Sequence, residues 1–240
     1  MRRAVILAGG LGTRLRPYTT VLPKPLMPVG DRPILDIVVR QLARAEFDRI
    51  TIATGYLAEL IEAFFGDGAR YGIPIDYFRE EQPLGTVGAL SLIDGLENDF
   101  LVMNGDILTD IDYAGLLERH RQGGQAATIA AHHRDVQVSL GVMRFEEPND
   151  PTLVTGYSEK PVLSYVVSMG VYCFAPRVRT HIPPGQHLDF PDLVLRLIGA
   201  GETVRAWHSD DHWLDIGRHD DYEQAQDEFN QLRERFLPDA

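Results

Sequence analysis

The chain is poor in lysine, poor in cysteine and free of long hydrophobic runs, and the last two shortages exclude particular structures. Only two of its 23 basic residues are lysines, Lys24 and Lys160. The single cysteine, Cys173, excludes an intramolecular disulfide, and its apolar neighbours indicate core packing rather than nucleophilic catalysis. No apolar run reaches the length of a membrane span or a signal-peptide core. We therefore expect a soluble, cytoplasmic protein with no membrane partner.

An excess of basic charge is also absent. The formal net charge of the 240 residues is −12, and the isoelectric point is about 5.0. Such a chain repels polyanions, which argues against nucleic acid as a partner. A polyanionic ligand would need a local cluster of basic residues. Such a cluster lies near the N-terminus and consists of Arg14, Arg16 and Lys24.

The two lysines both stand beside prolines, in Pro23-Lys24-Pro25 and in Glu159-Lys160-Pro161. Lysine is a compact point charge that suits a phosphate oxygen, whereas arginine is a planar fork. A chain that uses arginine almost everywhere else is expected to keep lysine where a fork does not fit. The alternative is an arginine-rich genome that left two lysines by chance.

Strand and helix patterns alternate along the first half of the chain. Apolar strands are expected at 4–7, 49–54, 75–78 and 100–103, and helices at 35–46, 57–65, 86–96 and 113–121. Buried strands that alternate with helices predict an α/β protein with a doubly wound, mostly parallel sheet.

The second half is richer in strands. Strand-like segments occupy 126–131, 140–145, 153–158, 166–174, 204–207 and 213–215, and helices are expected at 192–198 and 220–236. We expect a single domain over 1–240, with a nucleotide-binding half at about 1–122 and a β-rich half at about 123–240 around the same mixed sheet. No hexapeptide repeats follow the closing helix, so no C-terminal β-helix is expected.

A glycine-rich turn directly follows the first strand, at 7–17. Glycines let backbone N–H groups approach an anion closely. The turn is not a Walker A loop, because no Gly-Lys-Ser/Thr follows, and it is not a dinucleotide fingerprint, because Leu15 stands at the third glycine position. Arg14 within the turn and Lys24 shortly after it favour a phosphate site over a merely tight turn.

Several segments resemble, in order, the sugar-1-phosphate nucleotidylyltransferases. They are LAGGLGTRLRPYTTVLPKPLMPVGDRPIL, EEQPLGTVGAL, FLVMNGDIL, YSEKP, MGVYCF and HWLDIGRHDDYEQA, and they extend along nearly the whole chain. The resemblance implies a Rossmann-like nucleotidylyltransferase fold. It also implies transfer of a nucleoside monophosphate from a nucleoside triphosphate to a sugar 1-phosphate, with release of pyrophosphate, by a homodimer.

The same resemblance implies roles for individual residues. Arg14 clamps the triphosphate, Lys24 stabilises charge at the α-phosphate, and Asp106 and Asp215 bind Mg²⁺, which favours carboxylate and phosphate oxygens. Arg16 is either a helper or a surface charge. The nucleotide is expected at Leu7, Ala8, Gly9, Gly10, Gly12, Thr13, Glu80, Pro83, Gly85, Thr86 and Gly88, and the sugar phosphate at Gly141, Glu159, Lys160 and Gly170.

The choice of base depends on Glu80. Guanine offers two adjacent donors, which one carboxylate accepts together, whereas uracil and thymine suit an amide better. By its spacing to Gly85, Glu80 stands where thymidylyl relatives have a glutamine, which favours GTP and a likeness to mannose-1-phosphate and heptose-1-phosphate guanylyltransferases. A one-residue shift would put Gln82 there instead, so UTP, dTTP and CTP stay open.

The sequence leaves the second substrate undetermined. It is a hexose, heptose, amino sugar or cyclitol phosphate, and Leu140 and Met169 depart from the family pattern beside Gly141 and Gly170. A non-catalytic sensor of nucleotide sugars would be expected to have lost Lys24 or a metal carboxylate. His208, His212 and His219 surround Asp215 without regular spacing, which favours surface histidines over a zinc site.

Overall fold

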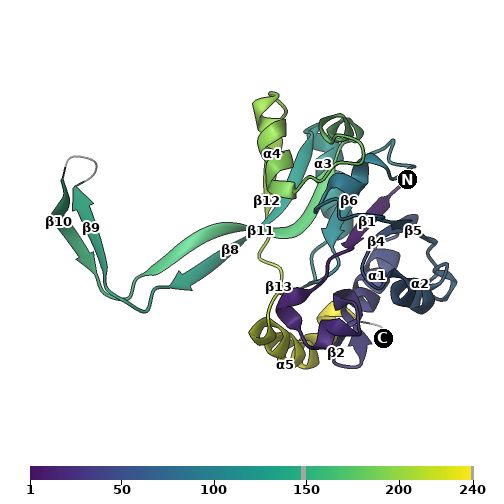
Figure 1. Cartoon of the computed structure of the whole chain (residues 1–240), viewed down its shortest axis with the longest axis horizontal. Coiled ribbons are helices and arrows are strands. Elements are labelled where there is room, and N and C mark those ends of the chain that lie inside the picture. The colour runs from purple at the N-terminus through teal and green to yellow at the C-terminus, as the bar shows by residue number, and fades with distance from the viewer. Residues whose placement is uncertain (147–149, 239–240) are drawn as a thin grey trace.

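The computed structural model describes residues 1–146 and 150–238, apart from the side chain of Pro151. A seven-stranded sheet at its centre has the order β12-β8-β11-β6-β1-β4-β5 (Figure 1). Its strands are β1 (Arg3–Ala8), β4 (Arg49–Thr54), β5 (Ile75–Arg79), β6 (Phe100–Asn104), β8 (Ala127–Gln137), β11 (Val162–Phe174) and β12 (Val204–His208). Only β11 runs antiparallel to its neighbours in this sheet. The predicted mixed, mostly parallel α/β sheet is confirmed.

Helices and turns cover both faces of the sheet because neighbouring residues of each strand point to opposite sides. Ile6 of β1 packs in the core beneath α1 (Ile34–Arg44), α2 (Ala58–Phe65) and α3 (Tyr113–Gly123), while Val5 packs in the core beneath α4 (Phe190–Gly199). Cys173 is fully buried in the first core, and burial raises the pKa of its thiol. This confirms the prediction that Cys173 fills the core. Among the described residues, no helix is both long enough and apolar enough to cross a membrane.

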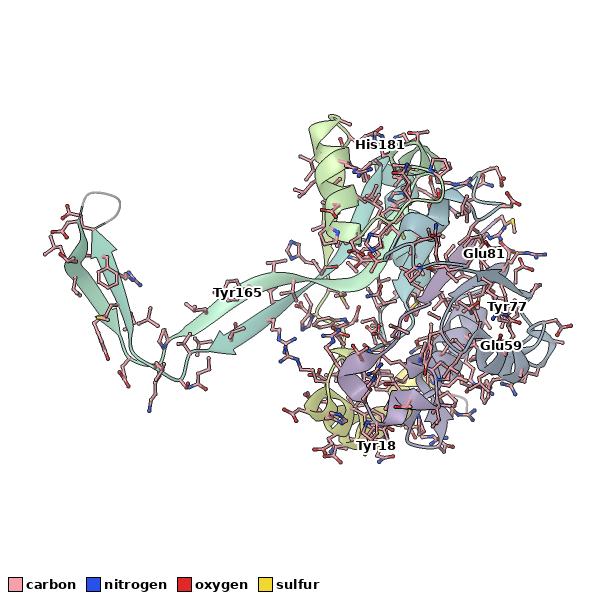
Figure 2. The ribbon with its side chains drawn as sticks, viewed as in Figure 1. Tyr18, Glu59, Tyr77, Glu81, Tyr165 and His181 are labelled. Carbon is pink, nitrogen blue, oxygen red and sulfur yellow. The ribbon has the colours of Figure 1, made fainter. Side chains whose placement is uncertain are left out.

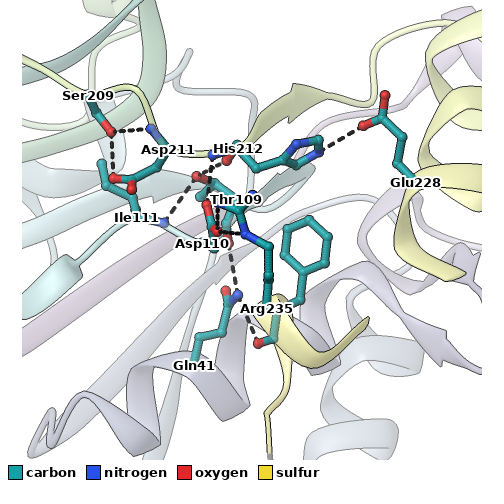
Figure 3. Close-up of polar contacts among 10 residues, drawn as sticks. Gln41, Thr109, Asp110, Ile111, Ser209, Asp211, His212, Glu228 and Arg235 are labelled. Atoms are coloured by element: carbon teal, nitrogen blue, oxygen red, sulfur yellow. Dashed lines mark hydrogen bonds and ion pairs between the residues drawn. The ribbon is translucent and has the colours of Figure 1, made fainter. Parts of the chain in front are cut away.

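The last helix, α5 (His219–Phe236), supports the N-terminal turn. Its Phe229 and Phe236 form a third core with Leu15 and Val29, where Val29 belongs to the short pair β2 (Pro28–Val29) and β3 (Arg32–Pro33). Arg235 also donates to Asp110, which accepts the backbone N–H of His212 at 2.7 Å (Figure 3). These bonds hold β13 (Trp213–Asp215) against β7 (Ile107–Thr109), and β13 ends in Asp215.

Two local expectations were wrong. The helix predicted at 86–96 is only a short 3-10 turn, Gly88–Ser91, because Val87 N–H donates to the carbonyl of Leu188 and the chain follows that segment instead. His212 is not a solvated surface residue: its Nε2 lies 2.8 Å from Glu228 Oε2, and its side chain is only 19% exposed. His208 and His219 are exposed, and the described residues contain no group of three or more metal-binding side chains.

The outer halves of β8 and β11 leave the body of the protein and form an arm. We define the arm as 134–146 and 150–166, which includes β9 (Val142–Glu146) and β10 (Asp150–Ser158). Figure 1 shows the arm projecting from the body, with the β9–β10 pair bent upward at its far end. The sequence predicted strands here, but β8 and β11 are longer than expected, and among residues 1–146 and 150–238 no third strand pairs with their outer halves.

Candidate active site

A cavity of about 450 Å³ opens at the carboxyl ends of β1 and β6. Ligands of α/β proteins bind at such an edge, where the strand order reverses. The predicted residues on its wall are Leu7, Ala8, Gly9, Gly10, Gly12, Thr13, Arg14, Lys24, Glu80, Pro83, Gly85, Thr86 and Asp106. The structure therefore brings together all of the predicted catalytic residues and every predicted nucleotide contact except Gly88.

The glycine-rich turn packs tightly against the segment that carries Lys24. Gly12 has a φ of +59°, and a β-carbon there would lie 2.9 Å from Thr19 Cγ2 and 3.1 Å from Lys24 Cβ. The Thr19 hydroxyl donates to the carbonyl of Gly12 at 2.8 Å. Only glycine combines this backbone conformation with this close contact, so the turn fixes the start of the Lys24 side chain.

Lys24 is 8% exposed, and its ammonium group forms an ion pair with the Asp106 carboxylate. Arg14 approaches the same region from the turn: a β-carbon on Gly217 would lie 3.4 Å from Arg14 Nη1 and 3.7 Å from Asp215 Oδ1. Arg14, Lys24 and Asp106 thus converge in this cavity, and Asp215 lies close enough to feel the charge of all three. Such a group can neutralise a phosphate chain and a divalent cation together.

The two carboxylates sit on neighbouring backbone segments. Asp106 lies in the turn between β6 and β7, and Ile216 N–H donates to its carbonyl at 3.2 Å, while Asp215 pairs with Ile107. Desolvation by the cleft walls and the charge of Asp106 raise the pKa of Asp215, and Lys24 and Arg14 oppose that shift. Two crowded carboxylates with few other protein ligands fit Mg²⁺, which takes its remaining oxygens from phosphates and water.

Asp215→Asn is expected to raise the free energy of unfolding of the metal-free protein at neutral pH, although it removes a predicted metal ligand. The folded state raises the pKa of Asp215 above its ordinary 3.8, so ionisation costs the folded state more than the unfolded chain. The gain should therefore grow as the pH rises from 3.8 through the raised pKa, and vanish in acid. Thermal unfolding with a chelator, from about pH 3 to about pH 8, measures it. A less stable variant at neutral pH would contradict this reasoning.

Glu80 lines the same cavity and is half-buried, and a β-carbon on Gly9 would lie 3.1 Å from its Oε1. Its Oε2 accepts the backbone N–H of Leu84 at 3.0 Å. Burial raises the pKa of Glu80, and the hydrogen bond from Leu84 and the nearby His187 oppose the shift. A carboxylate so placed can accept hydrogen bonds from a ligand that offers paired donors.

Gly85 and Gly88 were both predicted to let the backbone approach the base, but they differ in position. Gly85 lines the cavity with a φ of +73°, and a β-carbon there would lie 2.6 Å from the carbonyl oxygen of Leu188. Gly88 is buried and does not line the cavity, and a β-carbon there would lie 2.5 Å from the Gln186 carbonyl oxygen. Its close neighbour is therefore protein backbone and not the cavity.

Sequence reasoning missed several residues of the wall. His187 and Asp189 enter the cavity from a segment about a hundred residues from Glu80, through the pairing of Leu188 N–H with the Leu84 carbonyl at 2.9 Å. No sequence pattern signals that pairing. The remaining unpredicted residues are Pro25, Asn104, Gly105 and Gly217, all beside predicted ones. Because these four residues lie in the same motifs as predicted ones, the sequence could have indicated them as part of the site.

A second cavity of about 470 Å³ adjoins the first and shares Thr86, Asn104 and Asp189 with it. Its other lining residues are Ile107, Ser168, Met169, Gly170, Tyr172, Phe190, Pro191, Trp213 and Asp215. Gly170 is thus the one predicted sugar-phosphate residue that the structure places beside the cleft. Gly141, Glu159 and Lys160 lie on or at the bend of the arm and line neither cavity.

The sheet and this cleft together define an α/β protein with a cleft that carries both cations and carboxylates at the carboxyl edge of its strands. The family model described as nucleotidyl transferase matches residues 3–231, and the chain belongs to that family. The family predicted from the sequence is confirmed.

Individual relatives differ in the nucleotide that their names give. The chain is 35% identical, over 93% of its length, to UTP–glucose-1-phosphate uridylyltransferase from Synechocystis sp.. It is 32% identical, over 91% of its length, to mannose-1-phosphate guanylyltransferase from Mycobacterium tuberculosis. The chain spans 62% of the length of each of these relatives. Among solved structures, HddC from Yersinia pseudotuberculosis is similar with a TM-score of 0.72 and 26% identity, over 95% of this chain and 100% of HddC.

Proposed function

We propose that this chain transfers a nucleoside monophosphate from a nucleoside triphosphate to a sugar 1-phosphate and releases pyrophosphate. The convergence of Arg14, Lys24 and Asp106 in the first cavity with Asp215 in the adjoining second cavity carries this proposal. The names of the relatives support it, because they are sugar-1-phosphate uridylyl- and guanylyltransferases.

The reaction needs positioning and charge neutralisation more than proton transfer. An oxygen of the sugar phosphate forms a bond to the α-phosphorus, and the bond from that phosphorus to the bridging oxygen of the pyrophosphate breaks. The attacking phosphate is already ionised, so no base is required. Arg14 binds the outer phosphates of the triphosphate. The Lys24 ammonium leaves its ion pair with Asp106 and pairs with the α-phosphate, where negative charge must be stabilised. Mg²⁺, held by Asp106 and Asp215, supplies further charge neutralisation when bound.

We propose GTP as the preferred nucleotide, with Glu80 as the residue that selects guanine. Glu80 is a half-buried acceptor on the cavity wall, and a carboxylate there can accept both donors of guanine. The relatives include both uridylyl- and guanylyltransferases, so this choice depends on Glu80 and not on the family.

Glu80→Gln is expected to lower kcat/KM for GTP by about ten- to a hundredfold, because guanine loses a charged acceptor for its two donors. The values for UTP and dTTP should fall less or rise. Glu81→Gln is the matched control, since Glu81 is the exposed neighbour in sequence. The same nucleotide profile in wild type and Glu80→Gln would place the base selector elsewhere.

The direct test is pyrophosphate release with Mg²⁺, using five nucleoside triphosphates against a panel of sugar and cyclitol 1-phosphates. Release with GTP and one class of sugar phosphate is expected. Selective release with another nucleotide would keep the reaction and discard the role of Glu80. Triphosphate binding without release from any pair would favour a non-catalytic sensor of nucleotide sugars.

A further inference from the structure

The arm exposes apolar side chains that a protein normally covers. Of the 19 exposed large hydrophobic residues in the described part of the chain, 11 lie on the arm: Val136, Leu140, Met143, Phe145, Leu153, Val154, Tyr157, Val162, Leu163, Tyr165 and Val166. Figure 2 shows Tyr165 on the part of the arm that lies outside the body. An isolated two-stranded ribbon is at best marginally stable in water, and a concentration of exposed apolar residues marks an interaction surface.

The arm is a stiff continuation of the central sheet. β11 pairs with β8 without a shift from Val162 opposite Gln137 to Ser168 opposite Ala131, and the register changes only between Ser168 and Tyr172. This uninterrupted ladder of hydrogen bonds resists bending within the arm itself. The arm therefore projects as one unit, and its apolar residues are available to another molecule.

The second cavity lacks what a sugar 1-phosphate needs. Two aspartates, Asp189 and Asp215, are its only charged lining residues in the part of the chain that the structure describes, and no lysine, arginine or histidine lines it. Apart from a divalent cation at Asp215, a phosphate dianion bound there would meet no basic side chain among the described lining residues. The cleft of a single chain is therefore incomplete for the second substrate.

The arm carries a suitable group of residues at its bend. A β-carbon on Gly141 would lie 1.8 Å from the Tyr157 hydroxyl, which donates to Glu159 Oε2 at 3.2 Å. Lys160 follows with a φ of +45°, a backbone conformation that non-glycine residues adopt rarely and that is often found at functional sites. No hydrogen bond or ion pair to another described residue occupies its ammonium group. Acceptor and cation are thus assembled on the arm but away from the cleft of their own chain.

We propose that two copies of this chain exchange arms, so that Lys160 of the partner subunit completes the second cavity and binds the phosphate of the sugar 1-phosphate. The exchange covers the apolar arm and supplies the missing cation in one step. Two-fold symmetry then gives two identical composite sites. The identity of the bound phosphate depends on the function proposed above, whereas the exchange itself does not.

The test pairs two variants that are inactive for different reasons. Lys24→Ala disables the body of a protomer, Lys160→Ala disables its arm, and each alone should lose most of its turnover. A mixed dimer has one site with an intact body and an intact partner arm. Random co-assembly should therefore restore about one quarter of wild-type activity. Arg14→Ala serves as a second body variant, in case loss of the Lys24–Asp106 pair disturbs folding. A mixture as inactive as its components would overturn the composite site.

The mass in solution, measured by light scattering, tests the exchange without reference to activity. Wild type should be a dimer, and Tyr165→Asp should shift it towards monomer. Leu60→Asp is the matched control, since Leu60 is an exposed apolar residue of α2 on the side of the body away from the arm (Figure 1). A monomeric wild type, or a dimer that Tyr165→Asp does not weaken, would overturn the proposal. A dimer dispersed by Tyr165→Asp would support exchange even if no sugar phosphate were turned over, a result that would count only against the proposed function.

Discussion

Asp106→Asn is expected to lower kcat/KM by at least about a thousandfold while the protein stays folded. Asp106 is the carboxylate that both pairs with Lys24 and raises the pKa of Asp215, so it lies at the centre of the charges in the cleft. Asparagine has nearly the same shape as aspartate but no charge. It should therefore weaken the binding of the divalent cation that we propose Asp106 and Asp215 hold. The loss should be visible in turnover and in the Mg²⁺ concentration required for half-maximal rate.

The control for this variant is Asp94→Asn, which changes an exposed aspartate that lines neither cavity. It should retain wild-type kinetics. Circular dichroism and the thermal midpoint should show that Asp106→Asn is folded. Turnover of Asp106→Asn close to that of wild type, at the same Mg²⁺ concentration, would remove the metal-binding role from this residue.

Lys24→Arg is expected to lower kcat by about a hundredfold or more, although the charge is kept. Lys24 is 8% exposed, its stem lies against the turn at Gly12, and prolines flank it in the chain. A guanidinium group is wider than an ammonium group and presents its donors in a fixed plane. It cannot occupy the position of the Lys24 ammonium, which we propose lies near the α-phosphate, without moving the turn.

Arg205→Lys is the reverse exchange at an exposed position of β12 and should leave turnover unchanged. The comparison separates a requirement for lysine at one position from a general tolerance of either cation. A fully active Lys24→Arg variant would show that the scarcity of lysine in this sequence carries no functional information.

The sequence predicts the parts of the fold that depend on local patterns. The strand at 49–54 and the helix at 57–65 match β4 and α2 to within one residue, because apolar runs and helical spacing are local properties. The glycine turn, Lys24 and Asp106 were predicted for a similar reason: each lies in a compact motif, and the sheet brings the ends of β1 and β6 together.

The sequence does not predict what depends on contacts between distant segments. The 86–96 region has apolar residues at helical spacing, yet it pairs with Leu188 and forms only a short turn. His187 and Asp189 enter the cleft through that same pairing. The arm is the largest surprise: its strands were predicted, but their alternating apolar residues could equally have faced a core of the same chain.

Exchange of labelled pyrophosphate into GTP tests the central claim most directly, namely that the cleft joins the two substrates without a protein nucleophile. The experiment uses the pair of substrates that the panel of triphosphates and sugar phosphates selects. Direct transfer predicts that label enters GTP only when the sugar phosphate or the nucleotide sugar is present, and that Asp106→Asn abolishes the exchange. Label that enters GTP without any sugar phosphate would reveal a covalent nucleotidyl-enzyme, with His187 in the cleft as the first residue to test, and would contradict the account.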